Sequence, residues 1–123
     1  MKLVRDNPGN RNYIRAADGD SITVGEEVYS GPLVITPDEV DTGWNVATFD
    51  ELSEESLRAL LRHDPEVVIV GTGEKQEFPA AELLGMFYQA GVGIEFMNTQ
   101  AACRTFNILV VEERKVVAGL IPG

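Results

Sequence analysis

Two hydrophobic periodicities divide this chain near Leu33. After that point, short apolar runs typical of buried strands alternate with segments whose apolar residues recur every three or four positions, as on one helix face. This strand–helix alternation predicts a mainly parallel βαβ sheet. We expect strands at Leu33–Ile35, Val67–Val70, Gly93–Met97 and Val116–Ile121. We expect helices from Thr48 or Ser53 to before Pro65 and from Pro79 to Gln89. A third helix is expected from a cap at Asn98 or Thr99 to about Glu113.

The segment before Leu33 follows a two-residue period instead. Asp18-Gly19 favours a tight turn because both residue types tolerate positive φ, and Ser21–Val24 alternates polar and apolar positions after it. These features predict a β-hairpin, with room for a third strand at Glu27–Tyr29. Residues 1–12 are expected to form a loose arm. We therefore predict one α/β domain over residues 1–123, with an N-terminal antiparallel hairpin added to the sheet.

Charge and composition narrow the functional classes. The net charge of −10 repels nucleic-acid backbones and anionic membrane surfaces, so we expect no nucleic-acid partner. No apolar run approaches the length of a membrane span, and the first residues lack the apolar core of a signal peptide, so direct membrane insertion is not expected either. A lone cysteine, Cys103, suits a reducing compartment. Together these features predict a cytoplasmic protein.

Metal and acid–base chemistry have little support in the sequence. One cysteine and one histidine cannot form a zinc cluster, and the acidic residues lack the spacing of a calcium loop. His63 is expected to lie at the end of the first helix, with no assigned catalytic partner. We therefore expect no metal, no cofactor and no catalytic residue.

The loops that follow two predicted parallel strands are the best location for a binding site. In open α/β sheets, ligands bind beyond the carboxyl ends of the strands. Gly71-Thr72-Gly73 begins like a dinucleotide-binding loop, but Gln76 occupies the position of the third glycine, so a tight turn is favoured over a nucleotide site. The second loop leads into a helix whose first backbone N–H groups attract anions. The candidate ligand-binding residues are Gly71, Thr72, Gly73, Asn98, Thr99, Cys103, Arg104 and Asn107.

Arg104 is the strongest of these candidates because it interrupts the small-residue stretch Ala101–Cys103. We expect its guanidinium to be at least partly buried beside the Gly71–Gly73 loop, where it needs either a carboxylate, such as Glu74 or Glu95, or a bound anion. Both alternatives stay open. For Cys103, a small buried hydrophobe is favoured over a reactive thiol, although the helix start and Arg104 would lower its pKa.

The carboxyl-terminal half resembles the Mth938-domain family, also called DUF498. The resemblance is carried by Gly71-Thr72-Gly73, by Gly93–Thr99 and by the run from Ala101 to Leu109, and it extends to Gly43-Trp44 and Leu120-Ile121-Pro122. One departure is Asn98, where the family usually carries aspartate. The resemblance implies a compact α/β domain with an extra hairpin and no established catalytic activity.

Relatives in this family include a mitochondrial assembly factor for respiratory complex I. The resemblance therefore implies an interaction protein with protein partners, acting as an assembly factor for a respiratory membrane complex. The alternative is a domain that binds a small anionic ligand, or a cryptic enzyme, using the rim around Thr72, Asn98 and Arg104.

Overall fold

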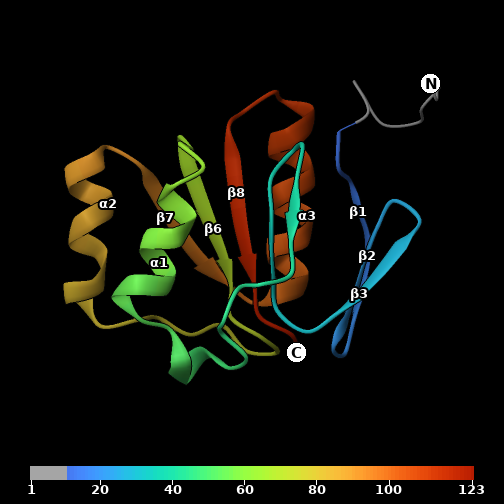
Figure 1. Cartoon of the computed structure of the whole chain (residues 1–123), viewed down its shortest axis with the longest axis horizontal. Helices are drawn as coiled ribbons and strands as arrows, with labels where there is room; N and C mark the ends of the chain where they lie inside the picture. The colour runs from blue at the N-terminus through green and yellow to red at the C-terminus, as the bar shows by residue number, and fades with distance from the viewer. Residues whose placement is uncertain (1–10) are drawn as a thin grey trace.

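The apolar run Val67–Val70, predicted as a strand, lies inside a five-stranded sheet (Figure 1). The computed structural model describes residues 11–123. The sheet has the order β5-β4-β8-β6-β7, and β6 pairs in parallel with both β7 and β8. Val68 and Ile69 of β6 are both fully buried, as predicted for a strand covered on two faces. The bounds are β4 Leu33–Ile35, β5 Val40–Asp41, β6 Val67–Gly71, β7 Gly93–Met97 and β8 Val116–Leu120.

The first strand of this sheet runs in a direction that the strand–helix alternation did not predict. β4 is antiparallel to β8, and β5, which the sequence analysis missed, is antiparallel to β4. The chain reverses between them because the Thr36 hydroxyl accepts hydrogen bonds from the Asp38 and Glu39 N–H groups (3.2 and 2.9 Å). The α/β class is confirmed, with a mixed sheet in which β6, β7 and β8 form the parallel part.

The first helix begins at the second of its two predicted starts. In α1 (Glu54–Leu61), the Ser53 hydroxyl accepts from the Ser56 N–H, and the Ser56 hydroxyl accepts from the Ser53 N–H. Thr48 makes no side-chain cap and precedes only the short 3₁₀ turn η2 (Phe49–Glu51). Ser56 therefore occupies the capping-box position that glutamate or glutamine usually takes.

The other two helices differ in how well they match the prediction. The helix expected from Pro79 starts later, with a 3₁₀ segment η3 (Ala81–Leu84) followed by α2 (Gly85–Ala90). α3 (Thr99–Val111) begins as predicted, because the Asn98 side chain accepts a hydrogen bond from a backbone N–H of the first turn at 2.8 Å.

The N-terminal strands form a second, three-stranded antiparallel sheet beside α3 (Figure 1). It consists of β1 (Ile14–Asp18), β2 (Ser21–Val24) and β3 (Glu27–Ser30), so the third strand is confirmed. Apolar side chains of β1 and β2 pack with α3 against one face of the large sheet, while α1 and α2 cover the opposite face. The arm predicted over residues 1–12 lies, for residues 1–10, outside the described part of the chain.

Trp44 anchors the long segment between β5 and α1 to the sheet. Its ring packs directly on Gly119 in β8, where an added Cβ would lie 2.6 Å from the nearest ring atom. Its Nε1–H donates to the Ser56 carbonyl at 3.1 Å. This glycine is therefore required by the close approach of the indole to the strand.

Candidate functional site

The two loops of the predicted rim do meet at the carboxyl ends of β6 and β7. The Thr72 N–H donates to the Met97 carbonyl at 2.8 Å, and the Thr99 N–H donates to the Gly73 carbonyl at 2.9 Å. The Gly73 N–H in turn donates to the Thr99 hydroxyl at 2.9 Å. The prediction that these loops converge is therefore confirmed.

The polar groups of this rim are already satisfied by the chain itself. Thr99 is buried, and its hydroxyl donates to the Ile121 carbonyl at 2.5 Å. Thr72 is also buried, and its hydroxyl donates to the Lys75 carbonyl at 2.5 Å. A Cβ on Gly71 would lie 3.0 Å from Thr99 Cα, so this glycine serves close packing between the loops. These contacts explain the loop sequence without a bound nucleotide.

Asn107 joins the N-terminal sheet to α3. Its amide oxygen accepts from the Ile14 N–H, and its amide nitrogen donates to the Ile14 carbonyl, both at 2.8 Å. The side chain thus pairs with the outer edge of β1 as a neighbouring strand would. Sequence analysis grouped Asn107 with Arg104 around a ligand but gave no sign of this structural role.

Arg104 does not lie where it was expected. It is exposed, and it lines a groove toward β1 rather than packing beside the Gly71–Gly73 loop. Within residues 11–123 it forms no ion pair with Glu74, Glu95 or any other carboxylate. The physical reason is helix register: the buried stripe of α3 passes through Cys103 and Phe106, and the next residue after Cys103 is rotated about 100° away from it.

The groove beside Arg104 lies between β1 and α3 and has a volume of about 120 Å³. Gln100 spans its end, because its side-chain amide donates to the Ala17 carbonyl at 3.1 Å. The lining combines two arginines with small and neutral residues: Ile14, Arg15, Ala16, Ala17, Gln100, Cys103, Arg104 and Asn107. Three of the predicted site residues, Cys103, Arg104 and Asn107, therefore lie together at this groove. The other predicted residues lie at the separate rim formed by the loops after β6 and β7.

Cys103 lies against this groove but is itself buried. Burial raises the pKa of its thiol to about 12, and this effect outweighs the nearby positive charge of Arg104, which lowers the pKa. The thiol is therefore protonated at neutral pH. This state supports a structural cysteine rather than a nucleophile.

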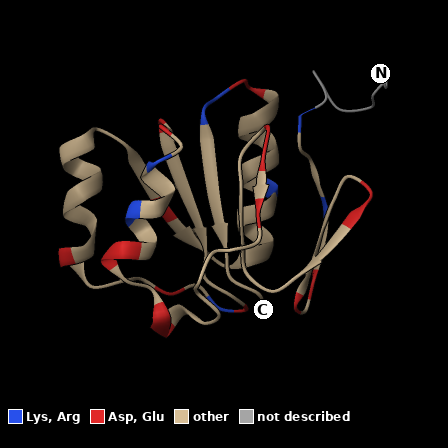
Figure 2. Cartoon of the chain, viewed as in Figure 1, with Lys and Arg blue, Asp and Glu red and all other residues tan. Residues whose placement is uncertain are grey.

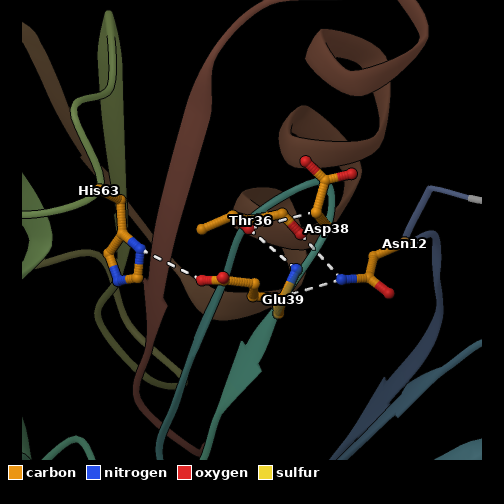
Figure 3. Close-up of polar contacts among 5 residues, drawn as sticks. All are labelled: Asn12, Thr36, Asp38, Glu39 and His63. Atoms are coloured by element: carbon orange, nitrogen blue, oxygen red, sulfur yellow. Dashed lines mark hydrogen bonds and ion pairs between the residues drawn. The ribbon is translucent and has the colours of Figure 1, made fainter.

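A larger cavity, of about 580 Å³, lies at the opposite end of the sheet, where β6 and β8 begin. Thr36, Glu39 and His63 line it, and Figure 3 shows their polar contacts. The neighbouring Asn12 donates from its side chain to the Thr36 and Glu39 carbonyls (2.8 and 3.1 Å), and His63 Nδ1 lies 3.6 Å from a Glu39 carboxylate oxygen. His63 therefore faces a carboxylate rather than solvent alone. The described charged residues of the lining are Arg11, Asp38, Glu39, Arg62, Asp64, Glu113, Arg114 and Lys115, with both signs equally represented.

The sequence analysis missed this cavity. Its walls come from the β4–β5 turn, the end of α1, the α3–β8 turn and the residues before β1, which are far apart in sequence and share no motif. Only the backbone conformation marks the cavity locally. Asp64 and Glu113, at φ 55° and 63°, are the non-glycine residues of the described part with a left-handed conformation, and both line the cavity.

The described residues show neither a metal-ion cluster nor a membrane-spanning helix. Among residues 11–123, no three histidine, cysteine or carboxylate side chains are grouped closely enough to hold a metal ion. The same residues contain no helix with the length and apolar character that crossing a membrane requires.

Comparison with known proteins identifies the family. A family model described as a protein of unknown function (DUF498/DUF598) matches residues 14–121. The chain is 35% identical to NADH dehydrogenase [ubiquinone] 1 alpha subcomplex assembly factor 3 of Rattus norvegicus over 89% of its own length and 60% of that protein. It is 32% identical to a 13 kDa major membrane protein of Francisella tularensis, over 77% of this chain and 76% of the relative.

Solved structures agree with this assignment. The solution structure of a Bordetella pertussis protein described as a Mth938-like domain superposes with a TM-score of 0.82 at 30% identity, covering 99% of this chain and 92% of that one. The fold suggested by the sequence resemblance is therefore shown. This chain spans only 60% of the length of the rat assembly factor.

Proposed function

Because this chain belongs to the DUF498/DUF598 family, we propose that it is an interaction protein that assists the assembly of a respiratory membrane complex. The observation that carries the proposal is the match to relatives named as assembly factors of NADH dehydrogenase. An assembly factor acts by binding subunits, so its partners are proteins. The hydrogen bonds of the Thr72–Thr99 rim support this role. The hydroxyls of Thr72 and Thr99 both bond to backbone carbonyls of the chain itself, so they stabilise the fold rather than offer donors to a ligand.

α3 offers a surface suited to a protein partner. Ile108 and Val111 lie one helical turn apart on α3 and are 57% and 56% exposed. Exposed apolar side chains that recur on one face of a helix gain by being covered. We take this pair, Ile108 and Val111, as the partner-binding face of α3.

Deletion of the gene in the native host tests the assembly role. We expect membranes of the deletion strain to contain less assembled NADH dehydrogenase, measured by NADH oxidation in native gels, and to accumulate partial complexes. The wild-type gene should restore assembly, whereas Ile108→Asp with Val111→Asp should not. Val28→Asp, at an exposed apolar position on β3, is the matched control and should restore assembly. An unchanged amount of complete enzyme in the deletion strain would contradict the proposal.

The proposed location is the cytoplasm, in contact with the membrane complex being assembled. The lone thiol and the acidic charge support it. Fractionation of host cells checks it: the protein should be recovered with the cytoplasmic fraction and, in part, with partial complexes. Recovery only in an extracytoplasmic fraction would overturn this placement.

Binding of a small anion is the second candidate function. One observation favours it: Arg104 lies unpaired at a groove together with a second arginine. The anion would then bind in the β1–α3 groove, and not at the Thr72–Asn98 rim that the sequence predicted.

A further inference from the structure

We propose that the groove between β1 and α3 binds a single oxyanion group, a carboxylate or a phosphate, between the guanidinium groups of Arg15 and Arg104. The inference goes beyond the assembly role and does not depend on it. It assigns a ligand chemistry to a specific place on the molecule.

The charge of the groove differs from that of the rest of the chain. Acidic residues outnumber basic residues by 20 to 10 in the sequence, yet the described groove lining contains two arginines and no carboxylate. Figure 2 shows basic positions on β1 and on the facing α3, whereas acidic positions are spread over the neighbouring turns and the start of α1. The larger cavity at the opposite end of the sheet instead carries equal numbers of both signs. An anion is therefore favoured locally in this groove.

Both arginines are available to a ligand. Within residues 11–123, the side chains of Arg15 and Arg104 make no hydrogen bond or ion pair, whereas those of Arg58 and Arg114 pair with nearby glutamates. A guanidinium group presents parallel N–H donors that match the two oxygens of a carboxylate or phosphate. Two such groups on opposite walls provide donors to one oxyanion from both sides.

The walls of the groove are held in place before any ligand arrives. Asn107 fixes Ile14 of β1 to α3 through two hydrogen bonds, and Gln100 fixes Ala17 through a third. The β1–β2 register shifts between Ile14 and Ala16, so Arg15 is the extra residue of a β-bulge. Bulges redirect a side chain and are common next to functional sites. A preformed site of this kind loses little entropy when it binds.

The size of the groove sets the size of the ligand. Its volume of about 120 Å³ corresponds to roughly four water molecules at about 30 Å³ each. Pockets for whole cofactors or drug-sized ligands are larger, at roughly 300–1,000 Å³. The groove therefore accommodates a free small anion or one acidic group that projects from a larger molecule.

NMR titration of the ¹⁵N-labelled protein tests the proposal. The probes are inorganic phosphate and glutarate, each added at constant pH and ionic strength with chloride as the balancing anion. We expect saturable shifts at the amides of Ala16, Ala17, Gln100 and Arg104. Tighter binding of phosphate would identify a phosphate source, and tighter binding of glutarate a carboxylate source; both outcomes support the site.

Variants decide whether the arginines carry the binding. Arg15→Gln and Arg104→Gln should each weaken it about tenfold to a hundredfold, the effect of losing one charge-assisted contact. Arg58→Gln, which removes an exposed arginine of α1, should leave it unchanged. All three positions are exposed, so the variants should fold. Shifts that never saturate, or equal weakening in all three variants, would overturn the proposal.

Discussion

Replacing Gly119 by alanine tests how Trp44 closes the face of the sheet. The new Cβ would lie 2.6, 2.9 and 3.0 Å from three atoms of the indole ring. Ordinary carbon contacts are about 3.5–4.0 Å, so the ring must move by about 1 Å. Trp44 is buried, and its Nε1–H is bonded to the Ser56 carbonyl, so the ring has little room to retreat.

The cost follows from these contacts. Overpacking of a well-filled core costs about 1–3 kcal/mol, and weakening the indole hydrogen bond adds about 0.5–1.5 kcal/mol. Alanine returns about 0.5–1 kcal/mol because it loses less backbone entropy than glycine on folding. We therefore expect the free energy of unfolding to fall by about 2 kcal/mol.

Urea unfolding followed by tryptophan fluorescence measures this change, because Trp44 is the chain's one tryptophan. Gly93→Ala in β7 is the matched control, since its Cβ would meet the nearest Val67 atom at an ordinary 3.5 Å. The control should be close to neutral. A loss below about 0.5 kcal/mol for Gly119→Ala, or an equal loss in both variants, would refute the packing argument.

Three further changes test other parts of the structure. Asn107→Ala removes both bonds to Ile14 and should cost about 2–3 kcal/mol in urea unfolding, with faster hydrogen exchange at the Ile14 amide; unchanged exchange would contradict the clamp. The raised pKa of Cys103 keeps the thiol protonated in the folded protein at a pH where the thiol of the unfolded chain ionises. The free energy of unfolding of the wild type should therefore fall relative to that of Cys103→Ala as pH rises from about 9 to about 12. Parallel pH profiles for the two proteins would rule this out. Glu113→Gly should raise the melting temperature, because glycine adopts φ 63° without strain, and a lower one would show that the glutamate side chain stabilises the turn.

Local sequence patterns predicted the parts of the fold that depend on local physics. The β-branched run of β6 and the Asn98 cap of α3 follow from period and capping, and both were predicted. β5 was not predicted, because a strand of two residues, Val40–Asp41, is too short to show a periodic pattern. A mainly parallel sheet was predicted, but the antiparallel direction of β4 was not, because β4 pairs with β8, which lies far along the chain and leaves no local pattern.

The candidate site was predicted less well, for a geometric reason. Convergence of the loops at Thr72 and Thr99 follows from strand direction, so the sequence could indicate it. The position of Arg104 depends on helix register against a sheet added at the N-terminus, and one step along the helix moved it from the core to an exposed groove. The larger cavity near His63 is assembled from distant segments, so no local pattern marked it.

We propose that this chain acts by binding a protein partner through Ile108 and Val111 on the exposed face of α3. A photo-crosslinking amino acid at position 108, expressed in the native host, tests it most directly, with the same group at position 28 on β3 as the control. We expect a crosslink from position 108 to a subunit of NADH dehydrogenase, identified by mass spectrometry, and none from position 28. The absence of such a crosslink at position 108, or the same products from both positions, would contradict it.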